Sequence, residues 1–329
     1  MSIAIGLQVW ASHVAWADLM DAGRSIDGLG FESLWSNDHF FPALGPESVV
    51  GPVDGPIFEG WSVLGGWAAV TSRVRLGCLV SGAAYRNPGL LVRMATALDH
   101  ASGGRAVLGI GAGWHERDHR MYGIAFPGVG ERLDRLAEAA AICRGLLDGE
   151  RVSMAGTWYS ADDAVNDPPP LQSRLPLVIG GSGEKRTLRI VARHADWWNA
   201  DGNDPAEFAR LNGVLDEHCA AIGRDPTSIR RTIGQPPPLV RPTPRQAQRD
   251  LAAILMRHGM PADVARDTAA ANHYAGPVSA ISDRLEAMAE AGASLAVFDW
   301  MAPFDPQTLE ALAGIAQTLS RRVNANVLY

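Results

Sequence analysis

The sequence predicts an α/β protein whose strands close into a (β/α)8 barrel of the TIM type, with insertions at the C-terminal face. Short apolar stretches alternate strictly with amphipathic helical patterns, eight of each, along the chain. Such alternation is typical of parallel sheets, and eight units favour a closed barrel over an open sheet. A length of 329 residues fits one barrel with insertions. We therefore expect residues 1–329 to form one domain.

The eight expected strands are short and mostly apolar, and they lie at residues 3–10, 31–36, 74–81, 105–111, 175–179, 197–199, 229–234 and 294–300. The helices that follow them are expected at residues 15–29, 61–71, 88–101, 132–147, 184–194, 205–222, 278–291 and 306–319. Gly30 ends the first helix. Pro88 suits a first helical turn, where its missing N–H costs nothing. Leu133, Leu136 and Leu147 share one stripe of the fourth helix.

Two segments interrupt the alternation. Residues 235–276 are rich in proline at first and then helical. They follow the seventh strand, on the side where barrel active sites form, so we expect a substrate lid rather than a separate domain. Residues 151–160 predict a small hairpin. The sequence shows no repeat of fixed period and no low-complexity linker.

Composition excludes several classes of function. A net charge of −7 and a pI near 5.7 argue against a nucleic-acid partner. Cys78, Cys143 and Cys219 are odd in number and far apart, which argues against a disulfide scaffold or a structural zinc site. No apolar run reaches the roughly 18 residues of a membrane span, and no leader pattern is present. We expect a soluble, cytoplasmic protein that acts on a small molecule.

Polar residues follow the second strand, where side chains reach a barrel's mouth. Asp38 offers an acceptor for ring N–H groups, and His39 is able to hold or pass a proton near neutral pH. The alternative is a loop-capping aspartate beside a solvated histidine. Cys78, in the third strand, has no neighbouring base in the sequence, so a buried structural thiol is the favoured interpretation.

Glycines mark the ends of the fourth and fifth strands. Gly109, Gly111 and Gly113 would let a flat ligand approach the backbone, although the pattern is a weak dinucleotide fingerprint. Residues 179–183 run from a strand through glycines into a helix, which favours an anion such as phosphate. Ser182 would add a hydroxyl, and Lys185 or Arg186 a charge. The alternative is a tight turn without a ligand.

A cluster of His115, Glu116, Asp118 and His119 invites comparison with metal sites. Its spacing is not that of the HExxH motif, and further ligands would have to come from elsewhere in the chain. A solvated helical turn is the favoured interpretation. We therefore expect no metal site.

Taken in order, these motifs resemble the luciferase-like monooxygenase superfamily, and among its members the branch that uses coenzyme F420. The resemblance rests on Asn37-Asp38-His39-Phe40, on Val74-Arg75-Leu76-Gly77 with Tyr85-Arg86-Asn87-Pro88, on Gly103-Gly104-Arg105, on residues 108–114 and on residues 179–183. Their order and spacing hold from about residue 3 to residue 202. The last barrel units match only in pattern.

The resemblance implies a barrel that holds a flavin or deazaflavin in its mouth. It implies that Asp38 contacts the cofactor, that His39 lies beside the reactive face, and that a non-prolyl cis peptide joins Cys78 to Leu79 beneath the ring. The other implied cofactor contacts are Ser81 beside the ring, Ala112, Gly113 and Trp114 along its edge, and Gly180, Gly181 and Ser182 at the phosphate.

The chain also departs from the family pattern. The sugar-phosphate dehydrogenases that it resembles carry an acidic residue where this chain has Trp114, so Glu116 or His115 would have to replace that acid. Some members that use FMN carry a histidine and a tyrosine for the phosphate, where this chain has Val129 and Leu133. This difference favours F420 over FMN.

The resulting hypothesis is hydride transfer between coenzyme F420 and a small organic substrate, with His39 as the proton-transfer group. One alternative is an FMN-dependent monooxygenase that uses oxygen and a partner reductase. Another is a non-catalytic, cofactor-binding barrel. By resemblance we expect a homodimer. A set of tryptophans would pave an apolar pocket, namely Trp10, Trp35, Trp61, Trp114 and Trp300.

Overall fold

The predicted strands close into a parallel barrel in the computed structural model, which describes residues 3–45 and 47–326. Neighbouring strands pair in parallel all the way round, and the last strand pairs with the first. In order round the barrel they are β1 (Ala4–Val9), β2 (Ser33–Ser36), β3 (Arg75–Cys78), β5 (Ala106–Gly111), β8 (Leu177–Gly180), β9 (Trp197–Asp201), β10 (Arg230–Gln235) and β13 (Leu295–Trp300). This arrangement confirms the expected (β/α)8 fold.

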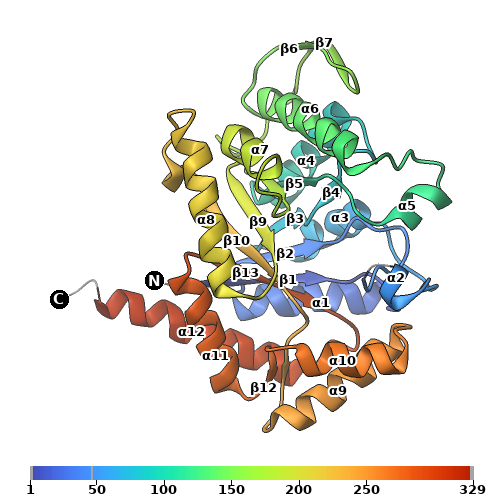
Figure 1. Cartoon of the computed structure of the whole chain (residues 1–329), viewed down its shortest axis with the longest axis vertical. Coiled ribbons are helices and arrows are strands. Elements are labelled where there is room, and N and C mark those ends of the chain that lie inside the picture. The colour runs from blue at the N-terminus through green and yellow to red at the C-terminus, as the bar shows by residue number, and fades with distance from the viewer. Residues whose placement is uncertain (1–2, 46, 327–329) are drawn as a thin grey trace.

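Helices surround the barrel, and both chain ends lie on the side of Figure 1 opposite α2 (Glu47–Val50) and α5 (Glu116–Met121). Asn87 caps its helix by accepting a hydrogen bond from the Gly89 N–H at 2.9 Å, and Gly30 ends the first helix in the left-handed region. The outer helices are α1 (Trp16–Leu29), α3 (Gly60–Val70), α4 (Pro88–Ser102), α6 (Val129–Leu147), α7 (Thr187–His194), α8 (Pro205–Ala220), α11 (Val278–Glu290) and α12 (Pro306–Asn326).

The third barrel strand differs from its expected form. It stops at Cys78 and resumes as β4 (Ser81–Gly82), because the chain bulges between them. The non-prolyl cis bond in this bulge joins Leu79 to Val80, so the expected position at Cys78–Leu79 is wrong by one residue.

Glycines of the neighbouring strands explain where the bulge fits. A Cβ at Gly111 would lie 2.7 Å from a Val80 methyl, one at Gly180 would lie 3.0 Å from it, and one at Gly109 would overlap the Cys78 carbonyl oxygen. These distances are below ordinary van der Waals contact. The glycines of the fourth and fifth strands therefore make room for the protein's own backbone and for Val80.

Alternate residues of each strand face the inside of the barrel. A buried cluster there contains Trp35, Val107, Val178, Leu295 and Val297. Because side chains on one face recur every second residue, the next inward residue of β13 after Val297 is Asp299. The barrel interior is therefore apolar in its middle and polar toward the C-terminal ends of the strands.

The insertion at residues 235–276 forms the helices α9 (Pro244–Arg257) and α10 (Ala262–Ala271), together with β11 (Leu239–Val240) and β12 (Ala275–Gly276). Its apolar residues pack in a cluster with Trp10, Val53 and Met301. The helices thus brace the loop after β2. They do not line the pocket described below, which the insertion touches through Gln235 and Pro236 among its described residues. A lid role stays a prediction.

The smaller expectations have mixed outcomes. The hairpin forms from β6 (Val152–Ala155) and β7 (Ser160–Ala164), and so runs four residues beyond its expected end at residue 160. The three cysteines are buried and unpaired, and burial raises the pKa of the Cys78 and Cys143 thiols. Within the described ranges, no helix is both long enough and apolar enough to cross a bilayer.

Candidate active site

A pocket of about 880 Å³ opens at the C-terminal ends of the barrel strands. This volume lies in the range of small-molecule and cofactor sites, and the C-terminal face is where barrel enzymes place their chemistry. Several residues expected to bind a ligand line the pocket, namely Asp38, His39, Leu79, Ala112, Gly113, Trp114, Gly180 and Gly181. These residues therefore lie together at one pocket, and their contacts with a cofactor stay a prediction.

Three expected residues do not line it. Cys78 is buried beneath the bulge. The Ser81 hydroxyl is buried and accepts a hydrogen bond from the Trp61 indole at 2.9 Å. The Ser182 hydroxyl accepts one from the backbone N–H of Asp201 at 3.3 Å. Their side chains therefore serve the protein's own structure.

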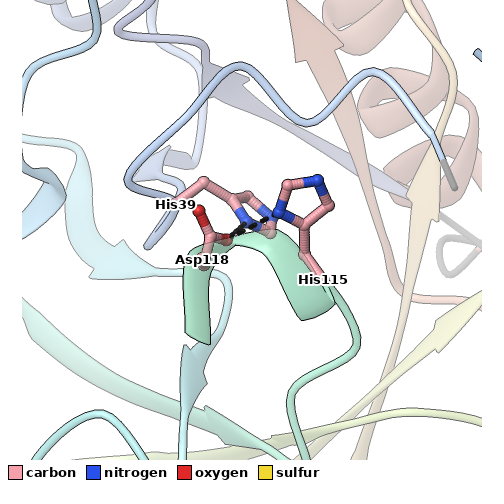
Figure 2. A group of neighbouring side chains, drawn as sticks. All are labelled: His39, His115 and Asp118. Carbon is pink, nitrogen blue, oxygen red and sulfur yellow. Dashed lines mark hydrogen bonds and ion pairs between the residues drawn. The ribbon is translucent and has the colours of Figure 1, made fainter. Parts of the chain in front are cut away.

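His39 is held by a carboxylate from a distant part of the chain. Its Nδ1 lies 2.6 Å from Asp118 Oδ2, and Figure 2 shows His39 and His115 both facing Asp118 on α5. With Nδ1–H donating to the carboxylate, Nε2 is the free, proton-accepting nitrogen. His39 lines the pocket and retains 15% of its side-chain exposure. The arrangement fixes the tautomer of an imidazole at the pocket wall.

Asp118 is fully buried yet holds its charge. Its Oδ1 accepts hydrogen bonds from the backbone N–H groups of Phe40 and Phe41 at 2.9 and 3.2 Å. Burial alone would raise the pKa of Asp118, but the approach of His115 and His39 and these N–H groups outweigh it, so the pKa lies well below its usual range. Asp118 is thus a carboxylate at neutral pH, able to orient His39.

The trio of His39, His115 and Asp118 offers three metal-ligand atoms within 4.8 Å of one another. Two ligands of a tetrahedral zinc ion would lie about 3.3 Å apart, given bonds of about 2.0 Å. The 2.6 Å between His39 Nδ1 and Asp118 Oδ2 is a hydrogen-bond distance, too short for two ligands of one ion. The geometry favours a positioning network over metal ligation.

Asp38 is tied to a second ion pair. Arg86 donates to Asp38 Oδ1 at 3.0 Å and to Glu59 Oε1 at 2.8 Å, and the Asp38 side chain is 1% exposed. Its charge is therefore neutralised within the protein. The two substitutes expected for the acid missing at Trp114 are not placed to serve, because Glu116 is exposed outside the pocket and His115 packs against Asp118.

The glycine turn after β8 forms another end of the pocket. Gly181 has φ +117°, which only glycine adopts without strain, and Thr187 at the start of α7 lines the same end. Within the described part of the chain, no acceptor is found for the backbone N–H groups of Ser182 and Gly183. The Arg186 guanidinium, which was expected to add charge here, donates a hydrogen bond to the Gly130 carbonyl at 2.9 Å. The donors at this end belong to the backbone.

The structure adds pocket residues that the sequence analysis missed. Arg132 of α6 lies at the wall, with its guanidinium 4.4 Å from the centre of the Phe126 ring. Gln8, Asn199, Asp201 and Asp299 line the side formed by β1, β9 and β13. Their strand positions alternate with buried apolar residues, and this alternation was the available signal.

The predicted tryptophan lining is confirmed in part. Trp10 and Trp114 line the pocket, and both rings lie near His39, at 6.4 and 5.4 Å between centroids. Trp35 fills the barrel interior, and Trp61 and Trp300 are buried away from the pocket.

A second cavity, of about 900 Å³, lies at the opposite end of the barrel. Arginines line it, but the charges there pair with one another, as in Arg174 with Asp196 and Arg231 with Asp216. It lies on the face that barrel enzymes use for stability rather than chemistry. The pocket around His39 is therefore the candidate active site.

Fold and site together define a (β/α)8-barrel protein with a ligand pocket at its C-terminal face and an oriented histidine in the wall. The chain belongs to the luciferase-like monooxygenase family, whose model matches residues 2–302. This match confirms the resemblance noted from the motifs.

The chain is similar to the F420-dependent glucose-6-phosphate dehydrogenase of Microbacterium testaceum, with 33% identity over 211 residues, or 63% of this chain and 60% of that protein. The match covers only 60% of the length of that dehydrogenase, and only 55% of the length of a phthiodiolone/phenolphthiodiolone dimycocerosates ketoreductase of Mycobacterium bovis. In fold the chain is similar to an F420-dependent secondary alcohol dehydrogenase, with a TM-score of 0.78, 17% identity and coverage of 96% and 98%. A monooxygenase from Streptomyces bottropensis is also similar in fold, with a TM-score of 0.76, 17% identity and coverage of 95% of this chain and 98% of that one.

Proposed function

We propose that this protein is an oxidoreductase that transfers hydride between coenzyme F420 and a small organic substrate. The observation that carries the proposal is one pocket that combines an oriented imidazole, His39, with backbone donors suited to an anion at Gly180–Gly183. The similarity to a relative named for F420 dependence supports the choice of cofactor.

The residues present fit a phosphate-bearing deazaflavin. The N–H groups of Ser182 and Gly183, with Thr187, would hold the phosphate, and Leu79 and Val80 would back the ring. Val129 and Leu133 line the wall as apolar side chains and offer no phosphate ligand, which disfavours FMN. When bound, the deazaflavin supplies the carbon centre that gives or takes a hydride.

His39 performs the proton transfer in this proposal. Asp118 keeps the proton on Nδ1, so that Nε2 takes a proton from a substrate hydroxyl as it is oxidised, or returns one to a carbonyl oxygen as it is reduced. The imidazolium formed in the first case is stabilised by the Asp118 carboxylate. Trp10 and Trp114 flank His39, with ring centres 6.4 and 5.4 Å from that of the imidazole.

Titration of the purified protein with F420, and separately with FMN, tests the cofactor. We expect F420 to bind about tenfold or more tightly than FMN. Tighter binding of FMN would instead favour the monooxygenase alternative, which requires oxygen and reduced flavin from a partner reductase. Failure of both cofactors to bind would contradict the proposal.

Stopped-flow mixing with reduced F420 and candidate acceptors tests whether the barrel is catalytic. F420 that binds without hydride exchange to any acceptor would support the alternative of a non-catalytic carrier. By resemblance we also propose a homodimer, which sedimentation equilibrium would test directly.

A further inference from the structure

One wall of the pocket presents hydrogen-bond acceptors that lack donors. Asp299, the last inward residue of β13, accepts a hydrogen bond from the Trp10 indole N–H at 3.0 Å through Oδ1. The described residues provide no donor for its other oxygen, and the residue lines the pocket. That oxygen is therefore available to a ligand.

Gln235 stands at the end of β10, the strand between β9 and β13. The residue lines the pocket, but it pairs with Phe298, whose side chain packs on the outer face of the barrel, so the Gln235 side chain leaves the strand on that outer face and is 3% exposed. Its Nε2 donates to the Gly202 carbonyl at 3.3 Å, whereas its buried Oε1 has no hydrogen-bond partner among the described residues. A buried amide oxygen without a donor costs about 1–3 kcal/mol. This oxygen lies on the outer face of the barrel, so the acceptors that face the pocket on this side belong to the aspartates.

Asp201 of β9 completes this wall. The strand β10 lies between β9, which carries Asp201, and β13, which carries Asp299. A Cβ at Gly234 of β10 would lie 3.6 Å from Asp201 Oδ1. Burial is the main cause that raises the pKa of both aspartates. The Trp10 hydrogen bond opposes the shift at Asp299 and the charge of Asp201 adds to it, which leaves the pKa of Asp299 at about 6. Both carboxyls therefore gain from a positive or donating ligand.

Positive charge at the pocket lies elsewhere. Among the described lining residues, Arg132 alone is an arginine or lysine, and its guanidinium donates to the carbonyl groups of Gly113 and Pro127 on the α6 side. An anionic group placed at the aspartate wall would face two carboxyls without a compensating cation. This wall therefore disfavours anionic substrates.

We propose that Asp201 and Asp299 select the substrate of this pocket, and that it is an alcohol or amine of zero or positive charge, not a phosphorylated or carboxylated molecule. This inference rests on the proposed function for the identity of the reaction only. The similar dehydrogenase is named for glucose 6-phosphate, so the inference predicts a different substrate class for this chain.

Three probes of one shape test the proposal: cyclohexylammonium, cyclohexanol and cyclohexanecarboxylate. Binding to the full chain is measured by ligand-observed NMR and calorimetry in saturating inorganic phosphate, which occupies the anion-binding end at Gly180–Gly183. We expect the ammonium and the alcohol to bind at least about tenfold more tightly than the carboxylate. Equal or tighter binding of the carboxylate, or failure of both donor probes to bind, would overturn the proposal.

Substitutions of the two aspartates test whether this wall causes the preference for ammonium. In D299N and in D201N the preference for ammonium over carboxylate should fall by about tenfold or more in each. E116Q, which removes an exposed carboxylate outside the pocket, is the matched control and should leave the preference unchanged. An unchanged preference in both aspartate variants would contradict the proposal.

The pH dependence of binding provides a further test. Because the pKa of Asp299 lies at about 6, the affinity for cyclohexylammonium, which stays charged throughout, should weaken between about pH 8 and pH 5, as this carboxyl takes up a proton. An ammonium affinity independent of pH, or the same dependence in D299N, would remove Asp299 from the wall. F420 titration of the same samples separates the two proposals, since a chain that fails to bind F420 yet prefers ammonium contradicts only the proposed function.

Discussion

Two sides of the barrel mouth differ in what their strand ends contribute to the pocket. In the arc formed by β3, β5 and β8, Gly109, Gly111 and Gly180 have no Cβ, and this leaves room for Val80 and the bulge. On the β9, β10 and β13 side, Asp201 and Asp299 extend side chains into the pocket. Glycine at a strand end is therefore a packing requirement in one arc, whereas the other arc presents two carboxyl groups to the pocket.

The largest expected effect is on the glycine arc. Gly109→Ala places a methyl group against the Cys78 carbonyl oxygen, which is backbone and unable to move aside. We expect a loss of about 3 kcal/mol or more in the free energy of unfolding, measured with urea. Gly213→Ala is the control, since nothing lies within 4 Å of its added Cβ in α8, and it should be neutral or stabilising. Equal stabilities would show that the bulge is not held by this contact.

The second effect concerns the histidine. Asp118→Asn and His39→Ala should each lower turnover by about 100-fold or more, with F420 affinity nearly unchanged, because the oriented proton carrier is lost. Single-turnover kinetics and a separate cofactor titration distinguish the two quantities. Unchanged turnover in the His39 variant would remove its proton-transfer role.

The third effect tests the acidic arc through stability. The folded-state pKa of Asp299, about 6, lies above its unfolded value, so ionisation is disfavoured by folding and costs stability as pH rises through that range. Asp299→Asn removes this cost. It should therefore stabilise the protein by about 1–3 kcal/mol at pH 8 and by nearly nothing at pH 4. Thermal melts at the two pH values check the sign, which an equal gain at both would contradict.

The smallest effect lies at the phosphate end. Arg186 is half-exposed and pairs with Asp134, so Arg186→Ala should change stability by about 1 kcal/mol or less and leave F420 affinity within about twofold. Gly181→Ala, which forces a side chain into φ +117°, should weaken F420 binding more. A larger loss in the arginine variant would mean that a side chain, not the backbone, holds the anion.

The fold was predictable because its signal is local and repeated. Each βα unit carries its own apolar run and helix stripe, so small errors at the ends of elements do not change the architecture. The helix start at Pro88 and the break at Gly30 are local as well, and both are confirmed. The cis peptide bond of the bulge lies one residue after its expected position, because the place of the bulge depends on glycines in neighbouring strands.

Much of the site depends on contacts that the sequence does not reveal. His39 and Asp118 are 79 residues apart, and Asp38 and Arg86 are 48 apart, so neither partner follows from a motif. Asp299 and Asp201 become recognisable only once the barrel closes and fixes which strand face is inward. The glycine motifs were predicted to cradle a ligand, but three of those glycines accommodate the chain itself.

The edge-to-face contact between His39 and Trp114 has a practical consequence. Trp114 is 48% exposed, and its ring centre lies 5.4 Å from that of His39. A protonated imidazole quenches indole emission by accepting an electron. Because the His115 ring lies 5.1 Å from that of Trp114, the fluorescence difference between the natural chain and Trp114→Phe is an optical readout of proton occupancy on the His39–His115 pair, obtainable before any substrate is identified.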